Sequence, residues 1–110
     1  MSKENEIKKE KSRLFEIFKD IDENKLKIVN TLIDRLAWLN VSIKDIEKNI
    51  DEQGTTIEYR NSETQWGVKD NPNIKTHIQY TKNIAMITKQ LIELVPPSKK
   101  KSKLDELMNE

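Results

Sequence analysis

The feature that most constrains this chain is a stripe of large aliphatic side chains between Asp22 and Gly54. Its members follow one another at alternating steps of three and four residues, which places them on one side of an α-helix. A β-strand repeats every two residues and would divide them between its two faces. Asp22 is suited to cap the start of such a helix, and Gly54 to end it. The stripe consists of Val29, Leu32, Leu36, Leu39, Ile43, Ile46 and Ile50.

A helix over residues 22–53 would be about 46 Å long at ~1.5 Å per residue, and it could not cover its own stripe. A second helix is predicted over residues 71–95, because Asn71-Pro72 suits a helix start and Pro96-Pro97 ends it. This second helix carries two neighbouring apolar stripes. They consist of Tyr80, Ile84, Ile87, Leu91 and Leu94, and of Ile74, Ile78, Thr81, Ala85, Thr88, Ile92 and Val95.

The first of these helices has a further apolar set in its first half, so it needs more than one partner. That set is Leu26, Ile28, Ile33, Ala37, Trp38 and Val41. We therefore expect an all-α fold in which residues 22–97 form a long antiparallel helical hairpin and residues 1–21 form a helix packed against it. The surplus apolar surface also predicts a homo-oligomer. Trp38 lies off the main stripe and is a candidate for contact with a partner.

Two segments lie outside the predicted helices, because the apolar spacing of those helices does not extend into them. Residues 54–70 are expected to be a loop whose Tyr59 and Trp66 close one end of the helix pair; loops of this length are often functional. Residues 98–110 are expected to be a basic tail, separated from the body by the two prolines. The tail has four lysines and then an apolar group at helical spacing, a pattern that can dock in a groove as a short helix.

Composition excludes several classes of function. The net charge of +1 leaves no strongly basic global field, so any affinity for DNA has to come from a local patch. The chain has no cysteine, which rules out disulfides and thiol chemistry and favours a reducing cytoplasm. The N-terminus does not resemble a signal peptide, and no segment approaches the ~18 consecutive apolar residues of a membrane span.

Catalytic and metal-binding patterns are also missing from the sequence. His77 is the only histidine, and the two glycines, Gly54 and Gly67, do not form a phosphate-binding loop. The carboxylates alternate with lysines, as on solvated helix faces, rather than clustering as in a two-metal nuclease. We therefore expect a protein that is not an enzyme and that needs no cofactor or metal.

The order of long helix, polar loop, returning helix and tail resembles the short all-helical small terminase subunits of tailed bacteriophages. Members of that family often carry a loop of the form EYxNGxxQxGxKxSP before the returning helix. The residues here that match it are Glu58, Tyr59, Asn61, Gln65, Gly67, Lys69 and Pro72, and the Y…KQLxxLLP pattern that follows is matched by Tyr80, Lys89, Gln90, Leu91, Leu94 and Pro96. The resemblance covers about residues 14–97. Ser62 and Asn71 replace a usual glycine and a usual serine.

The resemblance implies a non-enzymatic role in viral genome packaging, in the cytoplasm of the host bacterium. Small terminases form homo-oligomeric rings, bind double-stranded viral DNA, and recruit and regulate the large terminase subunit, an ATPase and nuclease. On this basis the tail would serve both partners. Contact with DNA is assigned to Lys99, Lys100, Lys101 and Lys103, and contact with a partner protein to Leu104, Leu107, Met108 and Trp38. Many family members carry an N-terminal helix-turn-helix module, which we do not expect here, and its absence would argue against sequence-specific recognition through a major-groove helix.

Three other interpretations compete with this one. The first is a helical-hairpin adaptor or regulator without DNA binding, which the near-zero net charge favours. The second is a secreted hairpin of the WxG type, in which one residue separates the tryptophan from the glycine. Here Trp66 and Gly67 are adjacent and the loop is long, which disfavours that class. The third is a small nuclease or other enzyme, which the missing acid cluster disfavours.

Overall fold

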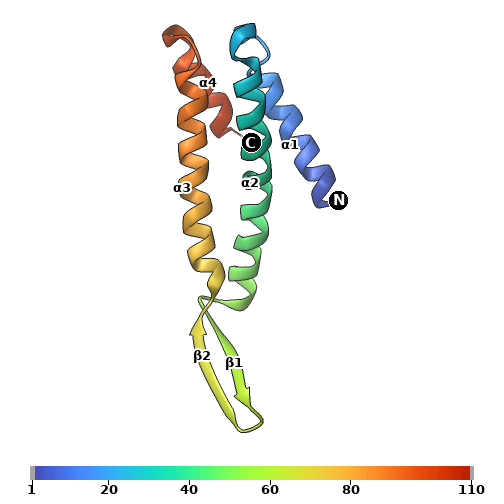
Figure 1. Ribbon diagram of the computed structural model, residues 1–110, viewed down its shortest axis with the longest axis vertical. Coiled ribbons are helices and arrows are strands. Elements are labelled where there is room, and N and C mark those ends of the chain that lie inside the picture. Colours follow the sequence, from blue (N-terminus) through green and yellow to red (C-terminus); the bar gives the residue numbers. More distant parts are fainter. Residues whose placement is uncertain (1, 110) are drawn as a thin grey trace.

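The computed structural model of the protein describes residues 2–109, which form an elongated body of 63 × 27 × 22 Å. The described residues are mostly helical, with four α-helices and one small antiparallel sheet (Figure 1). Short 3₁₀ turns precede the second and fourth helices. The elements in chain order are α1 (Lys3–Ile17), α2 (Leu26–Gln53), β1 (Thr56–Ser62), β2 (Gln65–Asp70), α3 (Pro72–Glu93) and α4 (Lys100–Met108), with the 3₁₀ turns at Glu23–Lys25 and Pro97–Lys99.

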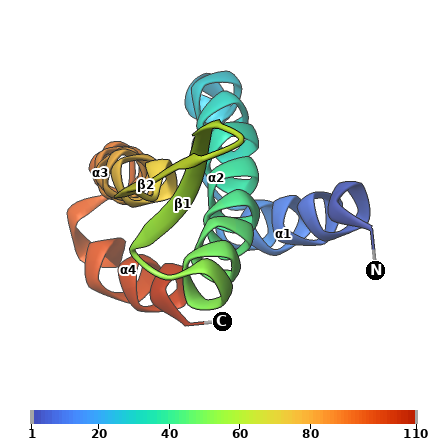
Figure 2. The same cartoon turned by 90° about the horizontal axis from the view of Figure 1, so that it is seen from below.

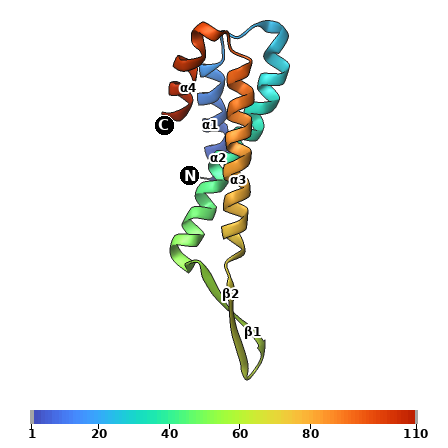
Figure 3. The same ribbon diagram turned by 90° about the vertical axis from the view of Figure 1, so that its left-hand side faces the viewer.

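The hydrophobic core lies at one end of the body, where all four helices meet. The long helices α2 and α3 lie side by side, α1 packs against α2, and α4 contacts both α1 and α3 (Figures 2 and 3). The core therefore takes residues from the first half of α2 and the last part of α3. Beyond the buried Val41 and Ser42, the second half of α2 has only half-buried and exposed residues, as does the first half of α3. The buried core residues are Leu14, Ile17, Phe18, Val29, Ile33, Leu36, Ala37, Leu39, Ile87, Leu91, Val95 and Leu107.

The helix ends follow from local chemistry. The Asp22 side chain caps the 3₁₀ turn that precedes α2, so the α-helix itself begins four residues later than predicted. Gly54 ends α2 with a φ of 84°, a left-handed value that favours glycine, as its position predicted. The Asn71 side chain accepts a hydrogen bond from the Asn73 N–H, and Pro72 occupies the first turn of α3.

The expectation of a loop over residues 54–70, and of a purely helical fold, is wrong. Residues 56–70 form a β-hairpin, and its register places Tyr59 opposite Gly67 and Arg60 opposite Trp66. The physical reason is a period of two in the sequence: Ile57 and Tyr59 fall on one face, and Val68 and Trp66 fall on the other. A turn at residues 63–64 reverses the chain.

The junction between the helices and the hairpin is organised by a buried asparagine. Asn71 is only 3% exposed. Its side-chain Nδ2 donates to Asn49 Oδ1 at 3.1 Å and to the Gly54 carbonyl oxygen at 3.0 Å, and Asn73 Nδ2 donates to the same Asn49 oxygen at 2.8 Å. One side chain thus joins the end of α2, the start of the hairpin and the start of α3. A serine there could cap α3 but could not make these amide bonds.

Candidate functional site

The segment expected to be a free basic tail is instead folded onto the body. The α4 helix buries Leu107, which is 8% exposed, in the four-helix core. Arg13 of α1 donates to the carbonyl oxygens of Asn109 at 3.0 Å and Glu106 at 3.4 Å, which fastens the last turn of α4. The apolar spacing of this segment indicated a short helix that can dock in a groove, and the structure has a helix here. Its partner, however, is the chain itself, so the prediction that Leu107 contacts another protein is wrong.

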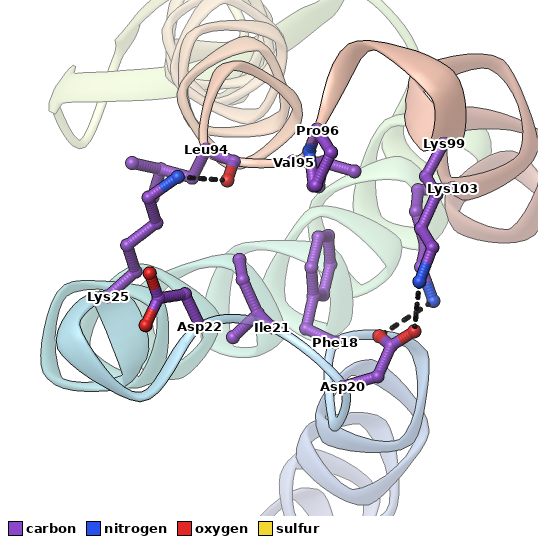
Figure 4. A pocket seen from close by; sticks show the side chains of 10 residues that line it. All are labelled: Phe18, Asp20, Ile21, Asp22, Lys25, Leu94, Val95, Pro96, Lys99 and Lys103. Atoms are coloured by element: carbon purple, nitrogen blue, oxygen red, sulfur yellow. Dashed lines mark hydrogen bonds and ion pairs between the residues drawn. The ribbon is translucent and has the colours of Figure 1, made fainter.

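Two of the four lysines assigned to DNA converge on one carboxylate in the turn after α1 (Figure 4). Lys99 Nζ lies 3.1 Å from Asp20 Oδ2, and Lys103 Nζ lies 3.2 Å from Asp20 Oδ1. Lys103 also donates to the Ile17 carbonyl oxygen at 2.6 Å, and its side chain is only 14% exposed. These contacts neutralise part of the basic segment and correct the assignment of Lys103 to DNA. Lys100 is half-buried and Lys101 is exposed, with no ion pair among residues 2–109.

Beside this ion cluster the same elements enclose a pocket of about 150 Å³. Phe18 and Val95 contribute its apolar wall, and Lys25 Nζ closes one side by donating to the Leu94 carbonyl oxygen at 3.0 Å. Figure 4 shows the cationic groups of Lys25, Lys99 and Lys103 directed to oxygens of the protein itself. The pocket is therefore a structural corner where α1, α2, α3 and α4 meet, and we do not assign a ligand to it.

The carboxyl group of Asp20 provides a pH test of the α4 contact. Hydrogen bonds from Lys99 and then Lys103 hold the pKa of Asp20 below its ordinary value. Since the folded state favours the charged form, this stabilisation is complete above the ordinary pKa of about 3.9 and is lost as the pH falls through the lowered value.

We expect the protection factors of the α4 amides, which correct for the intrinsic slowing of exchange in acid, to fall below that ordinary pKa. Asp20→Asn should accelerate this exchange already at neutral pH, and should remove the acid-dependent component contributed by this carboxylate. An identical pH profile of α4 exchange in the wild type and in Asp20→Asn would show that the two lysines do not fasten the helix. Glu16→Gln is a suitable control, because Glu16 pairs only with the exposed Lys19 among residues 2–109.

A second surface is an open apolar groove between α2 and α3, with a volume of about 630 Å³. Trp38 borders it and packs edge-on against Tyr80, with ring centroids 5.6 Å apart. Trp38 remains 44% exposed, and Met86 on α3 is 57% exposed. This placement fits the predicted role of Trp38 in partner contact, which stays a prediction.

Two other residues predicted to contact a partner protein, Leu104 and Met108, lie on α4 with the buried Leu107. Unlike Leu107 they are exposed, by 41% and 71%, and their contact with a partner stays a prediction.

The third surface is the β-hairpin, which projects from the end of the body opposite α4 (Figure 1). The Tyr59 ring lies across Gly67, so close that a β-carbon at residue 67 would come within 2.6 Å of it. Lys69 Nζ lies 5.8 Å from the centre of the same ring. Trp66 does not close the helix pair as expected. It is 64% exposed, with the Arg60 guanidinium 5.2 Å from its ring centre.

The hairpin is the part of the candidate site that residue types alone did not reveal. Val68 is 65% exposed, and neither it nor Trp66 was assigned to a contact with a partner. The signal that could have found them is the alternation of apolar and polar residues on both sides of the turn. The resemblance motif did cover this segment, but as a loop rather than as paired strands.

Within residues 2–109 no three histidine or acidic side chains gather as a metal site, and no helix combines the length and apolar character that a bilayer crossing requires. Comparisons of the chain with protein-family models, with curated proteins and with solved structures find no match. Functional interpretation therefore rests on the three surfaces and on the sequence motif that maps to one of them.

Proposed function

We propose that this protein is a small terminase subunit of a tailed bacteriophage, acting in the cytoplasm of the host. In this role it is not an enzyme. It forms a homo-oligomeric ring built on its long antiparallel helices, binds double-stranded viral DNA, and recruits and regulates the large terminase ATPase and nuclease. The proposal requires neither a cofactor nor a membrane contact.

The observation that carries the proposal is that residues of the motif at positions 58–72 contact one another in the hairpin and at the start of α3. Tyr59 and Gly67 face each other across the strands, Lys69 lies over the Tyr59 ring, and Pro72 begins α3. The spacing of these matched residues is thus what a hairpin followed by a helix start requires. The proposal takes this local contact network to be what the family motif encodes.

Assembly is supported by the apolar side chains that the monomer leaves uncovered along its long helices. Ile28 and Trp38 on α2 are 55% and 44% exposed, and Ile78 and Met86 on α3 are 48% and 57% exposed. Exposed apolar surface of this extent favours contact with another protein surface. In the proposed ring this surface lies between subunits, which would cover these four side chains.

Contact with DNA is assigned to Lys100 and Lys101, the two lysines of the basic segment with no ion pair among residues 2–109. Lys101 is exposed and Lys100 is half-buried, and a ring would repeat this pair once in each subunit. Such repetition makes a local basic surface effective in a chain whose net charge is only +1, because phosphate contacts add along the duplex. Lys99 and Lys103 have a structural role in the folded monomer.

A double charge reversal tests this assignment. We expect Lys100→Glu with Lys101→Glu to weaken binding of linear duplex DNA at least tenfold at low salt. If the pair contributes two phosphate contacts per bound site, the slope of log K against log salt should decrease by about 2. The matched control is Lys8→Glu with Lys9→Glu, two exposed residues of α1 with the same change in charge. Fluorescence anisotropy of labelled DNA measures both, and equal loss in the two double variants would refute the assignment.

One observation favours a second candidate, an oligomeric adaptor that does not bind DNA. Asp20 pairs with two lysines of the basic segment and offsets one of its four positive charges. Asp105 and Glu106 offset two more, so these residues together carry a net charge of only +1. If the wild type shows no DNA binding even at low salt, the adaptor is the better account and the DNA role is wrong. Binding that weakens steeply with salt favours the terminase subunit.

A further inference from the structure

The β-hairpin lacks the packing that a two-stranded sheet ordinarily needs. It projects past the ends of α2 and α3, and its strands form a sheet with no third strand among the described residues (Figures 1 and 3). A two-stranded hairpin alone is marginally stable in water. Yet this one exposes Trp66 and Val68 by 64% and 65%. Large apolar side chains on an isolated hairpin indicate a surface that is covered in the working state.

The two faces of this hairpin have opposite charge. Residues directly opposite in the register share a face, and the contacts of Lys69 with Tyr59 and of Arg60 with Trp66 agree with that division. We define the basic face as Ile57, Tyr59, Gly67 and Lys69, and the acidic face as Thr56, Glu58, Arg60, Trp66, Val68 and Asp70. The basic face has one positive charge. The acidic face has two negative charges and one positive, which leaves −1.

This charge distribution identifies what covers the hairpin. Its strands and turn contain Glu58, Glu63 and Asp70 against Arg60 and Lys69, a net charge of −1, which disfavours the phosphate backbone of DNA. Each face instead complements the other face of the same hairpin in charge and in apolar content. A second copy of this chain is therefore the partner that fits both faces at once.

We propose that hairpins of neighbouring copies stack with the basic face of one on the acidic face of the next. An interface between two different faces is heterologous, and repeating it around a rotation axis closes a ring. The inference thus deepens the proposed function and rests on it for the existence of that ring. In an in-register stack, Lys69 on the basic face of one copy lies beside Asp70 on the acidic face of the next copy. The basic face of the first copy, which includes Ile57 and Tyr59, then covers Trp66 and Val68 of the next copy.

The pair of Lys69 and Asp70 allows a charge-swap test. These residues are adjacent in sequence but belong to opposite faces, so they cannot pair within one chain. We expect Lys69→Glu alone and Asp70→Lys alone each to raise the concentration for half-assembly about tenfold, because each places like charges at the interface. The double variant should recover most of the wild-type value. Sedimentation velocity measures the assembly, and circular dichroism confirms equal helix content.

Controls separate this contact from a general effect of charge. Glu63→Lys makes the same change as Asp70→Lys, but in the exposed turn at the tip of the hairpin, and it should leave assembly within twofold of wild type. Because Asp70 precedes the start of α3, Asp70→Asn is included; it removes the charge without reversing it and should weaken assembly less than Asp70→Lys. Lys69→Glu does not alter the helix start and remains informative if Asp70→Lys reduces helix content.

The outcomes distinguish this inference from the proposed function. An assembled wild type with weakened single variants and a recovered double variant supports the stacked hairpins. If the wild type assembles and Lys69→Glu assembles equally well, the stacking is wrong and the ring stands. The same conclusion follows if the double variant assembles no better than the worse single variant. A wild type that stays monomeric at micromolar concentration overturns both.

Discussion

Leu91→Asp should unfold the protein. Leu91 lies on α3 with no exposed surface, in the core shared by all four helices. Removing a buried leucine costs about 2–5 kcal/mol, and the new carboxylate is buried among apolar side chains without a partner. The sum approaches the whole stability of a domain of this size, about 5–15 kcal/mol. We expect far-ultraviolet circular dichroism to show a loss of most helix content at 25 °C.

The adjacent residue provides the control. Gln90 lies on the same helix and is exposed, so Gln90→Asp introduces the same side chain at a solvated position. We expect it to change the free energy of unfolding by less than about 0.5 kcal/mol. If Leu91→Asp kept the helix content and melting temperature of Gln90→Asp, the assignment of the four-helix core would be wrong.

Asn71→Ala is expected to have the second largest effect, a loss of about 2–4 kcal/mol. The substitution removes the cap of α3, worth about 1 kcal/mol. It also deprives the Gly54 carbonyl and Asn49 of a donor within a buried junction, at about 1–3 kcal/mol. Asn71→Ser should lose less, because a serine hydroxyl still caps the helix. Urea denaturation followed by circular dichroism measures both variants.

The part of the structure that loses stability in Asn71→Ala distinguishes this junction from an ordinary helix cap. We expect hydrogen exchange in the hairpin and in the first turn of α3 to accelerate in Asn71→Ala, and the core at the other end of α3 to change much less. Asn30→Ala, at an exposed position of α2, is the control and should be nearly neutral. Equal destabilisation by Asn30→Ala and Asn71→Ala would contradict the proposed role of the Asn71 amide.

The two long helices could be predicted from sequence because their signals are local and repeated. Gly54 and Asn71-Pro72 set their facing ends to within a residue, and the steps of three and four gave the correct helix type. The apolar set in the first half of α2 predicted contact with the N-terminal helix, with a neighbouring subunit, or with both. Ile33 and Ala37 are buried where α1 packs. Ile28 and Trp38, from the same set, remain exposed, which spacing alone could not predict.

The hairpin and the docked α4 could not be predicted in the same way, because tertiary contacts decide them. A basic run after two prolines is typical of a solvated tail, and only the position of Asp20 in space holds Lys99 and Lys103 on the body. Residues 56–70 alternate apolar and polar side chains, but each alternation is short and the turn at residues 63–64 divides it. Their pairing depends on the close approach of Tyr59 to Gly67 across the strands.

The three surfaces have different roles in this account. We propose that the apolar groove at Trp38 and the charged faces of the hairpin contact other copies, at two levels along the same long axis. We propose that Lys100 and Lys101, at the start of α4, contact DNA at the other end. Arg13 and Asp20 fasten that helix, so they hold Lys100 and Lys101 in place. Assembly and DNA contact can thus be perturbed independently by substitutions at opposite ends of the body.

The mass of the wild-type particle in solution tests the central claim most directly. A closed homo-oligomer is required for the ring, for the stacked hairpins and for the repeated lysine pairs. We predict that multi-angle light scattering at micromolar concentration gives one discrete mass, several times the 13.0 kDa of the chain. That mass should not change on moderate dilution. A single species of 13.0 kDa across the same range would contradict the account.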